Sequence, residues 1–295
     1  MANSRSVERF VKRNGMSAGF ARRFVAGEQL EDTIGPVHAL NKLGITCSLD
    51  YLGENVTRAE EAVASAAYYL KLLRFIDDNQ LGSNVSLKLT QLGLDVDEGL
   101  AEGNLRTILA DAERYDQFVR IDMEGSEHTQ RTLDLFYRLW DDHKNVGVVI
   151  QSYLYRSEAD IERLVSTGVR VRLCKGAYNE PREVAYPHKA EVDENYRKLM
   201  RTLLTQGNYP ALATHDPSII EEAQAFVSAQ AISLNSFEFQ MLFGIRRDLQ
   251  RSLAANGYRM RVYVPFGTQW YGYMMRRLAE RPANLWFVLR NVLRR

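Results

Sequence analysis

The 295-residue sequence predicts an α/β fold, a (β/α)8 or TIM barrel preceded by a helical extension. Short apolar runs that suit strands recur eight times at intervals of about 30 residues, the length of one strand–helix–strand unit. Segments with helical spacing of apolar residues separate several of these runs. An open doubly wound sheet is the alternative, but the sequence contains neither GxGxxG nor GxxxxGK[ST], the phosphate loops that usually accompany such a sheet.

The predicted strands follow about forty helical, basic residues. Some alternate apolar with polar residues, as NVSLKLT and RMRVYVP do, and others are continuously apolar, as VGVVIQSY is. In chain order they cover residues 46–52, 84–90, 118–124, 146–153, 169–176, 210–214, 231–237 and 259–265.

Helical periodicity fills much of the sequence between the strands. The predicted helices cover residues 59–77, 129–142, 158–166, 192–206 and 218–229. After the last strand, Trp270, Met274 and Leu278 share one helical face. No low-complexity or proline-rich linker divides the chain, so we expect an N-terminal helical extension of residues 1–45 and one catalytic barrel domain of residues 46–295.

Composition excludes several classes of function. The chain has 38 Lys and Arg against 37 Asp and Glu, a net charge of +1, which gives no electrostatic reason to expect nucleic acid as a partner. Cys47 and Cys174 are its two cysteines, and their separation supports neither a disulfide framework nor a thiolate zinc site. His215 has no second histidine at a metal-ligand spacing, so we expect no metal site.

The sequence also bears on location. It contains no apolar run of about 20 residues, which a membrane-spanning helix needs, and no apolar signal core at its N-terminus. The first 25 residues are basic and interspersed with Phe and Val, which fits a solvated helix face or contact with anionic lipid. We expect a cytoplasmic protein, with peripheral contact at the inner face of the membrane as the alternative.

Polar residues at the predicted strand ends indicate a catalytic site, because such ends meet at one mouth of a barrel. In the second strand, alternation places Lys88 on the inward face with Ser86 and Thr90. A buried lysine must be paired or form a Schiff base, and Asp122 in RIDME is the expected counter-charge. A structural ion pair unrelated to substrate is the alternative for Asp122.

Two further groups of cations stand out. The segment VRVRLCKGAY, residues 169–178, is an apolar strand that delivers Arg172, Lys175, a flexible glycine and a phenol to its end. On the last helix, Arg276 and Arg277 could both reach one anionic substrate, or could be an ordinary exposed pair with Glu280 as an i, i+4 partner of Arg276.

Several motifs together resemble the proline dehydrogenases, also called proline oxidases. They are RVRLCKGAY, NVSLKLTQLG, RIDME, VVIQSYL, ATHD and VYVPFGTQWYGYMMRRLAERPANLWF, in the family's order from about Leu49 to Phe287. The resemblance implies a distorted (β/α)8 barrel with noncovalent FAD at the strand ends and an eighth helix over the barrel mouth. It implies oxidation of L-proline to Δ1-pyrroline-5-carboxylate, with hydride transfer from C5 to flavin N5 and electrons passed to a quinone.

The same resemblance implies roles for individual residues. Those at the reacting centre would be Lys88, Asp122, Arg172, Tyr178 and Tyr263. Substrate would be held by Lys88, Tyr263, Arg276, Arg277 and Glu280, with the two arginines and Lys88 on the proline carboxylate. The flavin would contact Met123, Gln151, Arg172, Lys175, Gly176, Ala177, Thr214 and His215. A tyrosine at position 263 goes with proline rather than hydroxyproline, and Cys174 stands where an aliphatic residue is usual.

The chain resembles the monofunctional bacterial form, which leaves oxidation of the product to a separate pyrroline-5-carboxylate dehydrogenase. Two other functions stay open on the residues alone. One is a Schiff-base lyase or aldolase that uses Lys88 or Lys175 as its amine nucleophile. The other is a noncatalytic sensor of an amino acid or a flavin.

Overall fold

A computed structural model of the chain describes residues 23–279, and of residues 275–279 it describes the backbone alone. Eight parallel strands form one closed barrel in chain order, with the first strand paired to the last. They are β1 (Thr46–Tyr51), β2 (Ser83–Leu87), β3 (Val119–Ile121), β4 (Val146–Gln151), β5 (Arg170–Cys174), β6 (Ala211–Ala213), β7 (Glu238–Leu242) and β8 (Met260–Phe266). The predicted (β/α)8 barrel is therefore confirmed.

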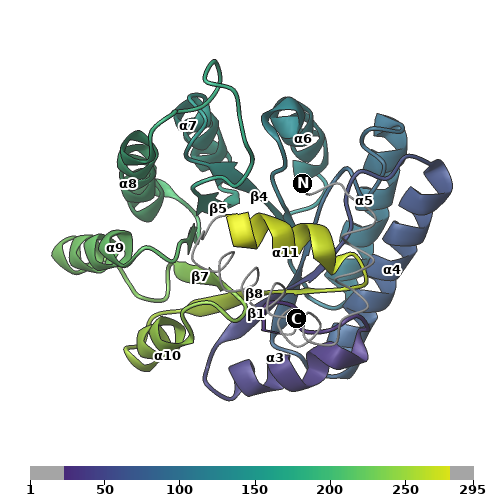
Figure 1. The fold of residues 1–295 in the computed structure, drawn as a ribbon, viewed down its shortest axis with the longest axis horizontal. Helices are drawn as coiled ribbons and strands as arrows, with labels where there is room; N and C mark the ends of the chain where they lie inside the picture. The colour runs from purple at the N-terminus through teal and green to yellow at the C-terminus, as the bar shows by residue number, and fades with distance from the viewer. Residues whose placement is uncertain (1–22, 280–295) are drawn as a thin grey trace, which may run out of the picture.

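Helices surround the barrel, as Figure 1 shows. They are η1 (Glu31–Thr33), α3 (Ile34–Asn41), α4 (Ala59–Asp78), α5 (Glu98–Arg114), α6 (Ser126–Trp140), α7 (Ser157–Thr167), α8 (Lys189–Gln206), α9 (Pro217–Ala229), α10 (Arg247–Ala255) and α11 (Trp270–Ala279). All five helices predicted between strands are present, and α5 and α10 fill the two positions between strands for which no helix was named.

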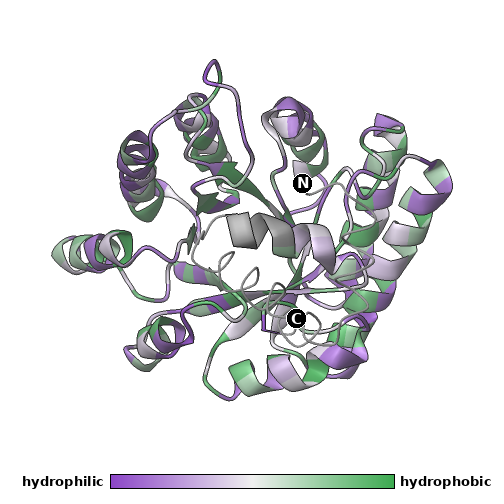
Figure 2. Ribbon diagram, in the orientation of Figure 1, coloured by the Kyte–Doolittle hydropathy of each residue, from purple (hydrophilic) through white to green (hydrophobic). Residues whose placement is uncertain are grey.

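The helices pack on the barrel through apolar stripes at helical spacing. In α4, Tyr69, Leu72, Leu73 and Ile76 are buried at positions i, i+3, i+4 and i+7, which lie on one face. Figure 2 shows hydrophobic residues concentrated in the strands and much of the hydrophilic surface on the surrounding helices. Burial of a Leu-sized side chain contributes about 1.5–3 kcal/mol, so these stripes hold the helix layer to the sheet.

The predicted position of the seventh strand is wrong. We expected residues 231–237, but the structure places β7 at Glu238–Leu242 and leaves the earlier stretch as a loop that follows α9. Glu238 and Gln240 are buried, and Arg261 of β8 donates to the Glu238 carboxylate at 2.8 Å. Because polar side chains of β7 face the barrel interior, this strand is not a continuous apolar run in the sequence.

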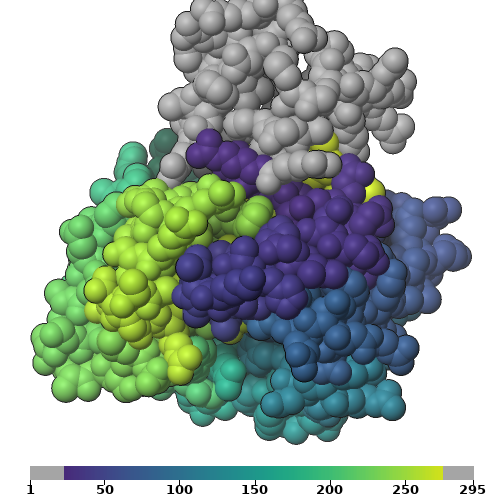
Figure 3. Space-filling view, turned by 90° about the horizontal axis from the view of Figure 1, so that it is seen from below, coloured from purple at the N-terminus to yellow at the C-terminus, as the bar shows by residue number. Residues whose placement is uncertain are grey.

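The segment before the barrel is bound to the end of β8 and to α11. The amide of Ala26 donates to the carbonyl of Pro265 at 2.9 Å, and the amide of Gly267 donates to the carbonyl of Gly27 at 2.9 Å. The indole of Trp270 donates to Glu28 at 3.0 Å. In Figure 3 the earliest and latest described parts of the chain accordingly lie against each other.

Helix α11 lies across the mouth of the barrel in Figure 1, which confirms the predicted position of the eighth helix. The division into an extension of residues 1–45 and a barrel domain stays a prediction, and the basic N-terminal stretch lies outside the described residues. Among residues 23–279, no helix is both long and apolar enough to cross a bilayer.

Candidate active site

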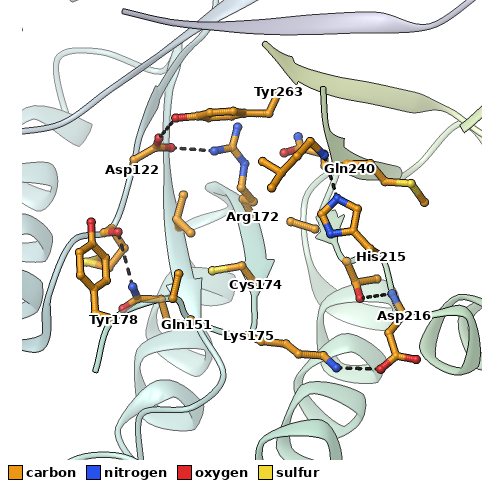
Figure 4. A pocket seen from close by; sticks show the side chains of 18 of the residues that line it. Asp122, Gln151, Arg172, Cys174, Lys175, Tyr178, His215, Asp216, Gln240 and Tyr263 are labelled. Carbon is orange, nitrogen blue, oxygen red and sulfur yellow. Dashed lines mark hydrogen bonds and ion pairs between the residues drawn. The ribbon is translucent and has the colours of Figure 1, made fainter. Parts of the chain in front are cut away.

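A cavity of about 680 Å³ opens at the carboxyl ends of the strands, beneath α11. Side chains from β4 to β8, from the residues after β2 and β3, and from α11 line it (Figure 4). They belong to Lys88, Asp122, Met123, Val149, Gln151, Arg172, Cys174, Lys175, Gly176, Ala177, Tyr178, Ala213, Thr214, His215, Asp216, Pro217, Gln240, Met241, Leu242, Tyr263 and Tyr273. All twelve distinct residues predicted for the centre and the cofactor site are among them.

The innermost part of the cavity contains Asp122 with three donors. The Arg172 guanidinium donates to its carboxylate at 2.7 Å and the Tyr263 hydroxyl at 2.8 Å (Figure 4). The Ser86 hydroxyl donates to it at 3.0 Å. Arg172 also lies over the Tyr263 ring, 5.5 Å from its centroid. Each of the three groups comes from a different strand, so the barrel itself sets their geometry.

The predicted counter-charge of Lys88 is corrected by the structure. The Lys88 ammonium lies 3.4 Å from both carboxylate oxygens of Asp50 in β1, whereas Asp122 pairs directly with Arg172. The register explains this, because Asp50 stands beside Ser86 in the β1–β2 pair, two residues before Lys88. Asp50 is fully buried and its role as the partner of Lys88 was not predicted.

Burial and charge set the protonation of these groups. Burial alone would lower the pKa of Lys88, but the charges of Asp50 and Asp122 outweigh it and raise the pKa, so Lys88 is a cation at neutral pH. Burial raises the pKa of Asp50 although Lys88 opposes that shift. Burial and then the Asp122 charge raise the pKa of Tyr263, which keeps its phenol a hydrogen-bond donor.

Some buried polar atoms of the cavity residues have no protein partner in the described part of the chain. They are Nε and Nη2 of Arg172 and Oε1 of Gln151. The Gln151 amide nitrogen is used, since it donates to the carbonyl of Glu124 at 3.1 Å. Buried polar groups are normally hydrogen-bonded, so these atoms indicate a ligand with complementary donors and acceptors.

A second charged group forms the rim of the cavity. Lys175, directly after β5, contacts Asp193 of α8 at 2.5 Å and Asp216 at 2.9 Å. Burial tends to raise the pKa of Asp216, but hydrogen bonds from Lys175 and Ser218 outweigh it and lower the pKa. The rim is thus ionic at neutral pH.

His215 is held in one tautomer by the backbone. The amide of Leu242 donates to Nε2 of His215 at 2.9 Å, so Nε2 is an acceptor and the ring proton is on Nδ1 (Figure 4). Next to it, the Thr214 hydroxyl accepts from the amide of Asp216 at 3.1 Å. These contacts fix the segment that follows β6.

The packing of the protein itself favours a glycine at position 176. Its φ is +112°, and a Cβ there would lie 2.5 Å from the ring of Tyr153. A larger residue at position 176 would therefore collide with the ring of Tyr153, whether or not a ligand fills the cavity.

The comparisons with known proteins decide the family. The model of the family described as proline dehydrogenase matches residues 34–290. The chain belongs to the proline dehydrogenase family. It is 44% identical to proline dehydrogenase 1 of Bacillus subtilis (strain 168) over 295 residues, 100% of this chain and 97% of that protein. It is 45% identical to the proline dehydrogenase of Deinococcus radiodurans over 279 residues, 93% of this chain and 90% of that protein.

A solved structure of a larger family relative has the same fold. It is proline utilization A (PutA) from Bdellovibrio bacteriovorus inactivated by N-propargylglycine, with a TM-score of 0.83 and 27% sequence identity. The match covers 89% of this chain and 32% of that chain, so the barrel corresponds to one part of a much longer protein.

Sequence reasoning missed several cavity residues. Gln240, Met241 and Leu242 belong to β7 and were missed because that strand was misplaced. Tyr273 of α11 was missed, although its spacing from Trp270 puts both on neighbouring faces of the helix. The predicted clamp stays a prediction: Arg276 and Arg277 are in α11 with side chains that are not described, and Glu280 lies outside the described residues.

Proposed function

We propose that this protein oxidises L-proline to Δ1-pyrroline-5-carboxylate with a noncovalently bound FAD. The observation that carries the proposal is a single cavity at the mouth of a proline dehydrogenase barrel that gathers cationic side chains and unpartnered buried polar atoms. A bound flavin would accept the hydride that leaves C5 of proline and pass electrons on to a quinone.

The cavity residues fit a flavin in their chemistry. The unpartnered guanidinium nitrogens of Arg172 would donate to the ring system and favour negative charge on it, and the free carbonyl oxygen of Gln151 would accept from it. Met123 would lie by the ring system. Lys175 would face the diphosphate, where Gly176 and Ala177 leave the backbone accessible.

Thr214 and His215 would bind further along the same cofactor, since both line the cavity. The Leu242 amide, which donates to Nε2, would hold the His215 ring in a fixed orientation there. The cavity thus offers donors to the polar groups of the cofactor along its length.

The substrate would occupy the inner cavity. Lys88, a cation at neutral pH, has Asp50 only at 3.4 Å and would donate to the proline carboxylate. Arg276 and Arg277 would complete the carboxylate clamp from α11, with Glu280 positioning them. Tyr178 and Tyr263 would enclose the pyrrolidine ring and exclude water, and Asp122 would orient Tyr263 and Arg172.

The surroundings of the two lysines disfavour a Schiff-base enzyme. An amine nucleophile must be neutral, yet the pKa of Lys88 is raised and Lys175 contacts two carboxylates. Borohydride treatment in the presence of a carbonyl substrate is expected to trap no adduct on either lysine. A noncatalytic sensor would instead bind L-proline while its flavin stays oxidised.

An anaerobic titration tests the proposed reaction directly. The protein reconstituted with FAD is expected to lose its absorbance near about 450 nm on addition of L-proline and to recover it with a quinone analogue. Persistence of the oxidised spectrum at saturating L-proline would exclude the reaction. Further oxidation of the product is expected to need a separate pyrroline-5-carboxylate dehydrogenase. A coupled assay with such an enzyme would detect the Δ1-pyrroline-5-carboxylate that is formed.

The clamp is tested by Arg276→Ala and Arg277→Ala. Loss of a charged hydrogen bond is expected to weaken proline binding by about 1.5–3 kcal/mol, mainly as a higher KM. Proline analogues without a carboxylate are expected to react equally well with the variants and the parent. Unchanged proline kinetics in both variants would exclude the clamp.

A further inference from the structure

The loop between β5 and α8 carries part of the cavity wall and is attached at one carboxylate. Lys175, Gly176, Ala177 and Tyr178 line the cavity, and Glu180 follows two residues later. Oε1 of Glu180 accepts from the amide of Ser126 at 2.9 Å and from the Tyr153 hydroxyl at 3.0 Å. Oε2 accepts from the Ser126 hydroxyl.

These contacts connect the ends of three consecutive strands. Ser126 is the first residue of α6 and follows β3 closely, Tyr153 follows β4, and Glu180 follows β5. Each of these strand ends also supplies a cavity residue, namely Met123, Gln151 and Tyr178. Glu180 therefore joins three strand ends that each border the cavity.

The chemistry of the contacts favours a carboxylate at position 180. Gly125, the N-cap of α6, has no side chain to cap the helix, and the Glu180 carboxylate takes that place at the positive end of the helix dipole. Burial and the neighbouring charge of Glu180 raise the pKa of Tyr153, so its hydroxyl remains a donor. A carboxylate can accept from all three donors, the Ser126 amide and hydroxyl and the Tyr153 hydroxyl.

Tyr153 transmits this attachment to the cavity wall. Its amide donates to the carbonyl of Lys175 at 2.9 Å, and its ring lies where a Cβ of Gly176 would be. The loop is also joined to the residues after β4 further along, through a bridge between Leu154 and Ala185. Residues 176–178 thus lie between two fixed points, the Tyr153–Lys175 bond and Glu180.

We propose that Glu180 is a positioning residue that holds residues 176–178 against the cavity through Ser126 and Tyr153. It does not line the cavity, and acts on the proposed oxidation through Tyr178 and the backbone of Gly176 and Ala177. This inference rests on the proposed function for its kinetic consequences, but the attachment itself can be measured without turnover.

The test uses Glu180→Gln, Tyr153→Phe and the double variant, with Glu183→Gln as the control. Glu183 is an exposed glutamate of the same loop with no cavity contact. In the full-length enzyme with FAD, we expect KM for L-proline to rise about tenfold in each single variant with kcat within about twofold, because one charge-assisted bond is lost. The KM of the double variant is expected to be no higher than the higher KM of the two single variants. Both single substitutions remove the bond between Tyr153 and Glu180, so their effects should not add.

Hydrogen exchange of the peptide around Tyr153 separates the two proposals. The Tyr153 amide is expected to exchange faster in Glu180→Gln and Tyr153→Phe than in the parent or Glu183→Gln, with no substrate present. Faster exchange in a protein that fails to oxidise L-proline would support the attachment while excluding the proposed function. Unchanged exchange and unchanged KM in both single variants, or a loss of thermal stability alone, would overturn the positioning role.

Discussion

The most direct test of the inner cavity is Tyr263→Phe, which removes a single oxygen. That oxygen donates to Asp122 at 2.8 Å in a partly buried site. A hydrogen bond to a charged group contributes about 1.5–3 kcal/mol to stability. Asp122 keeps its bonds from Arg172 and Ser86, and the ring keeps its contact with the Arg172 guanidinium, so we expect the low end, about 1.5 kcal/mol.

Thermal unfolding of the cofactor-free protein measures this loss. For a domain of this size a change of 1 kcal/mol moves Tm by about 2–4 °C, so Tyr263→Phe is expected to lower Tm by about 3–6 °C. Tyr258→Phe is the matched control, because Tyr258 packs on Phe239 but its hydroxyl forms no hydrogen bond in the described part of the chain. Its Tm is expected to change by about 1 °C or less.

Two results would refute the reasoning. One is a Tm loss in Tyr263→Phe no larger than in Tyr258→Phe, which would mean that the Asp122 contact contributes nothing. The other is full additivity with Asp122→Asn, because two residues that share one bond must couple.

Three further outcomes follow from the site. In Asp50→Asn the pKa of Lys88 should fall, because the Asp50 charge raises it. The alkaline limb of the pH profile of kcat/KM for L-proline should therefore move to lower pH. An unmoved limb would mean that Lys88 does not bind the substrate. Gly176→Ala should lower stability by about 1–3 kcal/mol in thermal melts, and more than Gly168→Ala, which also has a positive φ but open space around it; equal losses would contradict the Tyr153 contact. The lowered pKa of Asp216 stabilises the fold above pH of about 4, and that contribution is lost as pH falls further. In Asp216→Asn, Tm should therefore depend less on pH between about 2 and 5 than in the parent. Parallel curves of Tm against pH for the two proteins would contradict the ion pair with Lys175.

Much of the barrel could be predicted because its strands are apolar runs bounded by polar ends. The exception, β7, has the buried polar residues Glu238 and Gln240 alternating with the buried apolar residues Phe239 and Met241. This is a two-residue period that the sequence does contain. The preceding run AISLNSF, residues 231–237, is more apolar and was therefore predicted as the strand, although it forms a loop.

The site could be predicted in its membership but less well in its pairing. Alternation alone indicates that Lys88 faces inward, yet both neighbouring strands offer a carboxylate, Asp50 and Asp122. The choice depends on strand register and side-chain reach, which no local pattern contains. Contacts such as Glu180 with Ser126 join positions 54 residues apart and have no sequence signature.

The pairing of β1 with β8 has a consequence for biosynthesis. The Arg261 guanidinium donates to the carbonyl of Cys47, 214 residues earlier in the chain. The edge of β1 that pairs with β8 therefore has no partner until nearly the whole protein has left the ribosome. An unpaired strand edge invites association with other nascent chains, and such late closure slows folding. Stalled or truncated translation products that lack β8 should therefore depend on chaperones to stay dispersed.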